Sequence, residues 1–414
     1  MKHQIIDNIN NPEILEKLYR SDKKEFAKAF SEISNEYDSD LFNFWKIRLS
    51  KHADATISKF NKHDLIILIV VSFLSGLVAK LPDFISVLDK EIFFQRNLPL
   101  LVFNNLILYI FWQNKIFDKT KIIFYLISIL AILLFVNLLP YGNNDSVNLS
   151  IIHIPLIMWC FFGLSYISFD FRDTIKKIEF IKLNGELLIM SGLLILSGGL
   201  MTAITFGLFS AINIDIEKFY TENVLLFGGV SAPAVSYYLI RLYPNITSKI
   251  SPVMAKVFTP LVFITLFVYL ISFIFSDAAL AENRDLLIIF NLMLIAVMAI
   301  IIFSVSEIDK SKSKSIQIFI LFLLALMAVI IDLFALSAII TRLTYGFTPN
   351  KTVVFFSNLL IFINLILIAK NLFLSFLDIK KIELVEKIVA DYLTLYFAWT
   401  IFAIFLLPFI FDFQ

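Results

Sequence analysis

The feature that most constrains this chain is a series of long apolar runs, separated by short charged loops, that begins after residue 63. A helix needs about 20 mostly apolar residues to cross the hydrocarbon core of a bilayer. The runs predict eleven transmembrane helices, of which the first two are the shortest: 65–79, 98–112, 122–139, 149–168, 187–210, 224–240, 257–276, 286–305, 316–340, 352–374 and 393–411.

The composition excludes a set of soluble domains. Hydrophobic residues make up 59% of the chain and charged residues 17%, whereas soluble chains hold about 45–50% and about 25%. The net charge of +1 provides no basic surface for a nucleic acid, and the single Cys160 excludes an intrachain disulfide. We therefore predict an all-α fold, a polytopic integral membrane helical bundle.

Residues 1–63 differ from the rest, because charged residues alternate with short apolar groups. Ile14, Leu15, Leu18, Phe26 and Phe30 recur at near-helical spacing, which predicts amphipathic helices. We predict two parts, a cytoplasmic amphipathic helical region at 1–63 and a multi-pass transmembrane domain at 64–414. The first part is either a docking module for a cytoplasmic protein partner or a small helical cap on the membrane surface.

The distribution of Lys and Arg predicts the orientation. With the amino terminus in the cytoplasm, 22 of these residues fall on the cytoplasmic side near the runs and 7 on the external side. Cytoplasmic loops are enriched in positive charge in membrane proteins. We therefore expect a cytoplasmic amino terminus and an external carboxyl terminus.

Two predicted cytoplasmic loops carry similar segments, IKKIEFI at 175–181 and IKKIELV at 379–385. Six predicted spans separate them, so both segments face the same side. One interpretation is a parallel internal repeat, as in transporters with two related halves. The other is that both are basic amphipathic helices on an anionic membrane surface.

Asp332 is the only acidic residue well inside a predicted span. A carboxylate at membrane depth is costly and marks a functional site by default. Asn291 and Asn358, on the neighbouring spans, are expected at a similar depth, with Arg342 above them as a lid. These four residues are our candidates for binding a substrate or ion. The alternative is that the Asn and Asp side chains hold helices together by hydrogen bonds.

Small residues suggest close packing or a hinge in two further spans. Gly199, Ala203 and Gly207 form a stripe at four-residue spacing that lets another helix approach closely. Gly228, Gly229 and Pro233 loosen the next span. Such interrupted helices also occur at transporter binding sites.

Enzyme signatures are mostly missing. The four histidines have no metal-ligand spacing, and there is no phosphate-binding loop or nucleophile elbow. We predict no metal site and no cofactor. The one enzyme-like feature is Asp89 and Glu91, with Asp83 upstream, in the first external loop.

Several segments resemble one bacterial family of uncharacterised multi-pass membrane proteins, domain-of-unknown-function family 4153. The similar segments are Asn11–Arg20, 252–271, 282–307, 331–351 and 396–411. The most specific is YGFTPNK at 345–351, in which Lys351 stands where the family has Arg. The resemblance implies a location in the bacterial cytoplasmic (inner) membrane, and it supplies no catalytic residues.

The leading functional hypothesis is a transporter-like protein that binds or carries a small solute or lipid near Asp332. The first alternative is a non-catalytic membrane scaffold or sensor that docks a cytoplasmic partner through residues 1–63. The third is a membrane-embedded enzyme of lipid or glycan metabolism. Membrane lipids are expected contacts in every case, and the sequence does not predict an oligomeric state.

Overall fold

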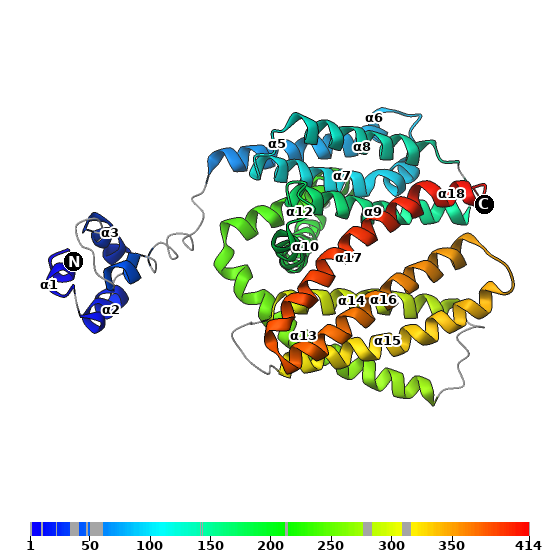
Figure 1. The fold of residues 1–414 in the computed structure, drawn as a ribbon. Coiled ribbons are helices and arrows are strands. Elements are labelled where there is room, and N and C mark those ends of the chain that lie inside the picture. The colour runs from blue at the N-terminus through cyan, green and yellow to red at the C-terminus, as the bar shows by residue number, and fades with distance from the viewer. Residues whose placement is uncertain are drawn as a thin grey trace. The chain divides into compact units, whose positions relative to one another are not determined.

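The computed structural model of the chain describes residues 2–9, 11–21, 23–33, 41–46, 49, 61–140, 142, 144–211, 214–275, 284–308 and 316–413. Helices are the only regular elements among these residues (Figure 1). The chain forms two compact units, one of Met1–Phe60 with Arg241–Asn245 and one of Asn61–Ile240 with Ile246–Gln414. The sequence analysis places the boundary between the two parts after residue 63, whereas the first segment of the first unit ends at Phe60.

The described residues of the first unit include the short helices α1 (Lys2–Asp7), α2 (Pro12–Ser21) and α3 (Lys23–Ile33), and residues 41–46 are also helical. The Asn11 side chain accepts a hydrogen bond from the backbone N–H of Ile14 and so caps α2. The buried side chains form a small aromatic core: Tyr19, Phe26, Phe30, Phe42 and Trp45.

The second unit holds the long apolar helices. Between them lie short elements: α6 (Leu81–Phe84), α11 (Glu217–Phe219), η1 (Tyr220–Leu225), η2 (Ile379–Lys381), η3 (Phe402–Leu406) and α18 (Leu407–Ile410). The long helices are α5 (Lys62–Ala79), α7 (Lys90–Gln113), α8 (Lys119–Leu138), α9 (Asp145–Tyr166), α10 (Thr174–Ala211), α12 (Leu226–Leu242), α13 (Pro244–Ile274), α14 (Arg284–Ser306), α15 (Ile316–Leu343), α16 (Pro349–Leu377) and α17 (Ile382–Ile401).

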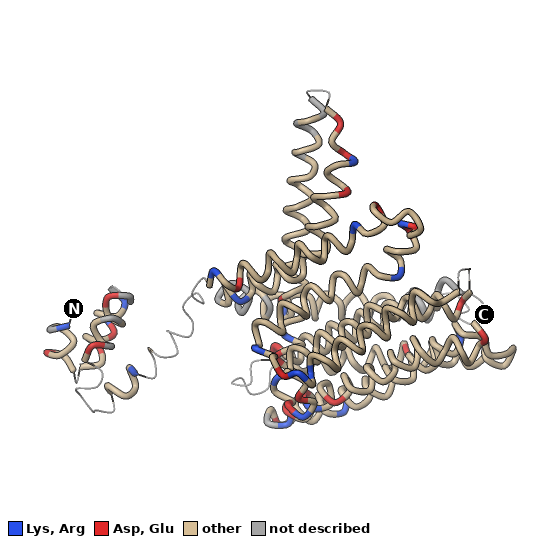
Figure 2. The backbone as a smooth tube through the Cα atoms, turned by 90° about the horizontal axis from the view of Figure 1, so that it is seen from above, with Lys and Arg blue, Asp and Glu red and all other residues tan. Residues whose placement is uncertain are grey.

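The all-α multi-pass prediction is confirmed. Within the described residues, nine helices are long and apolar enough to cross a membrane. The count of eleven stays a prediction, because α7 is outside that set and the described apolar part of α14 is shorter, at 290–306. In Figure 2 the charged residues gather at helix ends and turns, whereas the middles of the long helices are almost free of charge.

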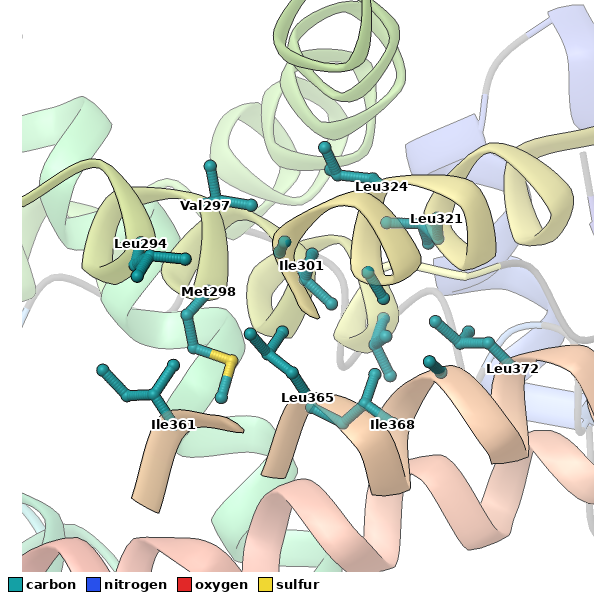
Figure 3. Packing of buried hydrophobic residues seen from close by; sticks show 14 of the residues in the cluster. Leu294, Val297, Met298, Ile301, Leu321, Leu324, Ile361, Leu365, Ile368 and Leu372 are labelled. Carbon is teal, nitrogen blue, oxygen red and sulfur yellow. The ribbon is translucent and has the colours of Figure 1, made fainter. Parts of the chain in front are cut away.

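Most of the buried side chains of the second unit belong to two apolar cores. The first joins α14, α15, α16 and α17, and the second joins α7, α8 and α9. In the first core, leucine, isoleucine, valine and methionine side chains interdigitate between α14, α15 and α16 (Figure 3). Buried Ala325, Ala328 and Ala335 occur on α15, and α15 shares its largest helix contact with α16. Small side chains allow such close approach of helices.

The two similar segments at 175–181 and 379–385 both begin long helices. The first lies in the opening turns of α10, and the second covers η2 and the start of α17. Each buries apolar side chains, among them Ile178 and Ile382. Burial of one face agrees with an amphipathic helix, and the internal repeat stays a prediction.

A proline near the carboxyl end explains a change of helix type there. Pro408 has no N–H, so the carbonyl of Ile404 loses its usual helical partner. The helix widens into the π-helical turn η3 at this point. The hydroxyl of buried Ser150 on α9 donates a 3.0 Å hydrogen bond to the Ile404 oxygen. Ser150 therefore satisfies a carbonyl that the proline leaves free.

Replacing Ser150 with alanine tests this contact. We expect Ser150→Ala to lower the free energy of unfolding by about 1–3 kcal/mol, because a buried carbonyl loses its donor. Titration with a denaturing detergent in mixed micelles measures the change. Ser128→Ala is the matched control, since that hydroxyl bonds only within α8 and its loss should have little effect. Equal effects of the two substitutions would contradict this role for Ser150.

Candidate functional site

Asp332 is fully buried in the middle of α15, with 0% of its surface exposed. Its neighbours along the helix face are the buried residues Ala328, Ile331 and Ala335. Neither carboxyl oxygen has a hydrogen-bond partner among the described residues. An unpartnered carboxylate in such surroundings is strongly unfavourable, so its environment favours either a neutral form or a bound ligand.

Two further polar groups within the apolar helices lie on α16 and α17. The amide of Asn364 donates a 2.8 Å hydrogen bond to the hydroxyl of Tyr396. Tyr396 in turn interacts electrostatically with Asp332. The Asn364 side chain is fully buried, and its oxygen has no hydrogen-bond partner among the described residues. Asp332, Asn364 and Tyr396 are hereafter called the Asp332 cluster. Sequence analysis did not identify Asn364 or Tyr396.

Two of the predicted site residues do meet each other. The amide of Asn358 on α16 donates a 2.7 Å hydrogen bond to the side-chain oxygen of Asn291 on α14. Asn358 is buried and Asn291 is half-buried. This bond joins two helices, as the structural alternative proposed, and Asp332 is not part of it.

Arg342 does not act as a lid through a bond to Asp332, because Asp332 makes no hydrogen bond within the described residues. Instead, the Lys351 ammonium donates to the carbonyl oxygens of Arg342 and Gly346, each at 2.9 Å. Gly346 has a φ of 109°, a left-handed conformation that glycine adopts without strain. Arg342 and Lys351 therefore belong to a closed turn between α15 and α16.

A cavity of about 670 Å³ lies between α9, α10, α13, α14, α16 and α17. Its walls are mainly apolar, and Tyr396 of the Asp332 cluster forms part of them. Other residues that line the cavity are His153, Trp159, Asn184, Leu188, Met254, Phe258, Ile295, Ala299, Phe303, Ser304, Ser357, Leu360, Trp399 and Thr400.

The polar groups in the cavity wall are few, and some are already used. The Trp159 indole donates to the Asn184 side chain at 2.8 Å, and the Thr400 hydroxyl donates to its own helix. The Tyr396 hydroxyl accepts from Asn364, but its proton has no acceptor among the described residues. Ser357 also lines the cavity, and its hydroxyl makes no hydrogen bond with a described residue. A ligand can therefore find hydrogen-bonding groups at Tyr396 and Ser357.

One side of the cavity lies at the apolar surface of the helical unit. Leu156, Leu188, Phe258 and Ile295 line the cavity and are also exposed, Leu188 at 77%. Exposed apolar side chains of this kind face lipid in a membrane protein. The cavity is thus accessible from the side where acyl chains would lie.

The acidic residues of the first predicted external loop have structural partners. Asp89 caps α7 by accepting a 2.9 Å hydrogen bond from the N–H of Ile92. The Lys90 ammonium bonds Asp83 at 3.1 Å and Glu222 at 3.3 Å. The hydrogen bond from Lys90 holds the pKa of Asp83 below its usual range, and the same bond raises the pKa of Lys90. These contacts give Asp83 and Asp89 structural roles, and the enzyme hypothesis for this loop stays a prediction.

The candidate packing glycines lie in open surroundings. No atom lies within 4 Å of the position that a Cβ would take at Gly199, Gly228 or Gly229. Ala203 is exposed, and the surroundings of Gly207 lie outside what the structure describes. Pro233 lies inside α12. No helix of the described chain therefore packs tightly against Gly199, Gly228 or Gly229, and a packing or hinge role stays a prediction.

Within the part of the chain that the structure describes, no group of three His, Cys, Asp or Glu side chains could hold a metal ion. No protein-family model, curated protein or solved structure matches the chain. Its several long apolar helices identify it as a multi-pass membrane protein.

Proposed function

We propose that the protein binds one small apolar or amphiphilic molecule, such as a single-chain lipid, in the cavity between α9 and α17 and carries it in the membrane. The cavity is the observation that supports this function most strongly. Its volume of about 670 Å³ lies within the range of about 300–1,000 Å³ that is typical of small-molecule sites. Its apolar walls and its exposed apolar side suit an acyl chain that enters from the lipid.

The polar groups in the cavity suit a ligand with a polar head. Tyr396 has a hydroxyl proton without an acceptor among the described residues, and Ser357 has an unused hydroxyl. A hydroxyl, carbonyl or carboxylate on the ligand would accept from these groups. Asp332, the intramembrane acid predicted from the sequence, does not line the cavity but interacts electrostatically with Tyr396.

A second candidate function is a scaffold or sensor, and the first unit favours it. Residues 1–60 have an aromatic core of their own, so they form more than a flexible leader to the membrane domain. We propose that this unit lies in the cytoplasm of a bacterium and that the protein resides in the inner membrane. The charge distribution and the resemblance to domain-of-unknown-function family 4153 support this proposal.

Quenching of tryptophan fluorescence tests the carrier function, because Trp159 and Trp399 line the cavity. Fatty acid brominated at mid-chain is titrated into the protein in nanodiscs of unbrominated lipid. We expect saturable quenching that largely disappears in the Trp159→Phe/Trp399→Phe variant. Ala299→Phe fills part of the cavity and should weaken the apparent affinity by at least about tenfold, which is about 1.4 kcal/mol.

The control is Ala296→Phe. Ala296 is exposed on the same helix α14 but does not line the cavity. This variant should bind the brominated fatty acid as the wild type does. Quenching that is not saturable, or that is the same in Ala299→Phe and Ala296→Phe, would show that the fatty acid contacts the outer surface only.

A further inference from the structure

We propose that the Asp332 cluster is a proton-binding site, and that binding of a ligand in the cavity changes the proton occupancy of Asp332 through Tyr396. The coupling rests on the proposed function, because it requires a ligand in the cavity. The proton site itself rests on the burial of Asp332 and on the lack of a hydrogen-bond partner for its carboxyl oxygens among the described residues.

The first argument is a count of donors and acceptors. Both oxygens of Asp332 and the side-chain oxygen of Asn364 are buried acceptors without a donor among the described residues. The amide of Asn364 already donates to Tyr396. The cluster therefore has three unused acceptors. A proton on Asp332 removes the charge that burial disfavours and turns one of these acceptors into an O–H donor.

The second argument concerns the charges around Asp332. The helices α14 and α16 pack against α15, and they contribute the uncharged side chains Asn291, Asn358 and Asn364. From α17, Tyr396 is the titratable group that interacts with Asp332, and Tyr392 interacts with Tyr396. The charged residues of the same helices, among them Arg342, Lys351, Lys370 and Asp391, form no ion pair with Asp332 among the described residues.

A metal cation fits the cluster less well than a proton. Hard divalent cations take about six or more oxygen ligands. The cluster offers the two carboxyl oxygens and the Asn364 oxygen, while the Tyr396 oxygen already accepts a hydrogen bond. A proton needs only one of these oxygens.

Tyr396 connects the cluster to the cavity. Its hydroxyl accepts a hydrogen bond from Asn364, and the residue lines the cavity. A ligand head group that accepts the Tyr396 proton would fix the orientation of this hydroxyl, and so would change the field at Asp332. Only the carboxyl O–H bond of Asp332 breaks or forms in the coupled step. The released proton passes to water at the membrane surface.

Infrared spectroscopy of the full-length protein in nanodiscs tests both parts. A neutral carboxylic acid has a carbonyl band that a carboxylate lacks. We expect such a band near neutral pH, and expect it to be lost in Asp332→Asn and retained in Asp391→Asn, whose carboxyl is exposed on α17. Protein made with carboxyl-¹³C aspartate assigns the band to aspartate even if a variant folds poorly.

The coupling is tested by adding the brominated fatty acid to saturation, as judged by tryptophan quenching. We expect the band to shift or weaken in the wild type, and expect no change in Tyr396→Phe, which keeps the ring but lacks the hydroxyl. If the fatty acid binds but the band does not change, the coupling is overturned and the proposed function is left intact. Absence of quenching overturns the proposed function and the coupling together.

Two further results would overturn the proton site. The first is a wild type without an aspartic acid band across the pH range in which the protein is folded. The second is a band that disappears when sodium chloride replaces choline chloride at constant ionic strength, because sodium would then be the ion that the cluster binds.

Discussion

Arg96→Met is expected to lower the free energy of unfolding by at least about 3 kcal/mol, because several buried carbonyl groups lose a charged donor. Arg96 lies in α7 with only 3% of its surface exposed. Its guanidinium donates to the carbonyl oxygens of Val136, Asn137, Leu139 and Pro140 at 2.9–3.4 Å. These carbonyls lie in the last turn of α8 and in the two residues that follow it, where the helix supplies no further N–H donors. The positive charge also complements the negative end of the helix dipole.

Arg96→Lys should cause an intermediate loss, since an ammonium keeps the charge but is a single point donor that cannot reach four carbonyls in a planar arrangement. Arg172→Met removes the same charge from an exposed position and should change stability by less than about 0.5 kcal/mol. Titration with a denaturing detergent in mixed micelles compares the three variants. Similar losses for Arg96→Met and Arg172→Met would mean that the guanidinium does not hold the end of α8.

Substitutions of Asp332 are expected to change stability in opposite directions. Asp332→Lys places a long cation among buried apolar residues and should lower the free energy of unfolding by at least about 3 kcal/mol. Asp332→Asn keeps the size of the side chain, adds N–H donors and removes the ionisable group from a buried position that offers it no hydrogen-bond partner among the described residues. We expect it to raise stability by about 1 kcal/mol. The same mixed-micelle titration measures both changes.

Asp391→Lys is the control for the lysine substitution, because it makes the same charge reversal at an exposed position of α17. Its effect should be small. If Asp332→Asn destabilised the protein as strongly as Asp332→Lys, the carboxylate would be ionised and held by a partner, and the neutral form that we propose would be wrong.

The helices could be predicted from the sequence because lipid leaves the backbone few options. In hydrocarbon every N–H and C=O must be bonded within the chain, so a long apolar run becomes a helix. This reasoning failed to place Arg96, which the sequence reading left in a loop before span 98–112. The structure starts α7 at Lys90 and buries Arg96. Only the position of the end of α8, which lies 40 residues away in the chain, explains that burial.

The candidate site was predicted in part. Depth in the membrane follows from sequence position, and this was enough to suggest that Asn291 and Asn358 could meet, which they do at 2.7 Å. Depth does not give the rotation of each helix about its axis. The sequence therefore did not predict Tyr396 and Asn364 as site residues, although both are polar residues within apolar helices. The cavity could not be predicted at all, because it is the space left between six helices.

The most direct test of the central claim, that the cavity holds one amphiphilic molecule, is native mass spectrometry of the protein mixed with one equivalent of the brominated fatty acid. We predict one bound fatty acid per chain in the wild type and in Ala296→Phe, and a marked loss of that species in Ala299→Phe. No discrete one-to-one species in the wild type, or the same occupancy in both phenylalanine variants, would contradict the claim.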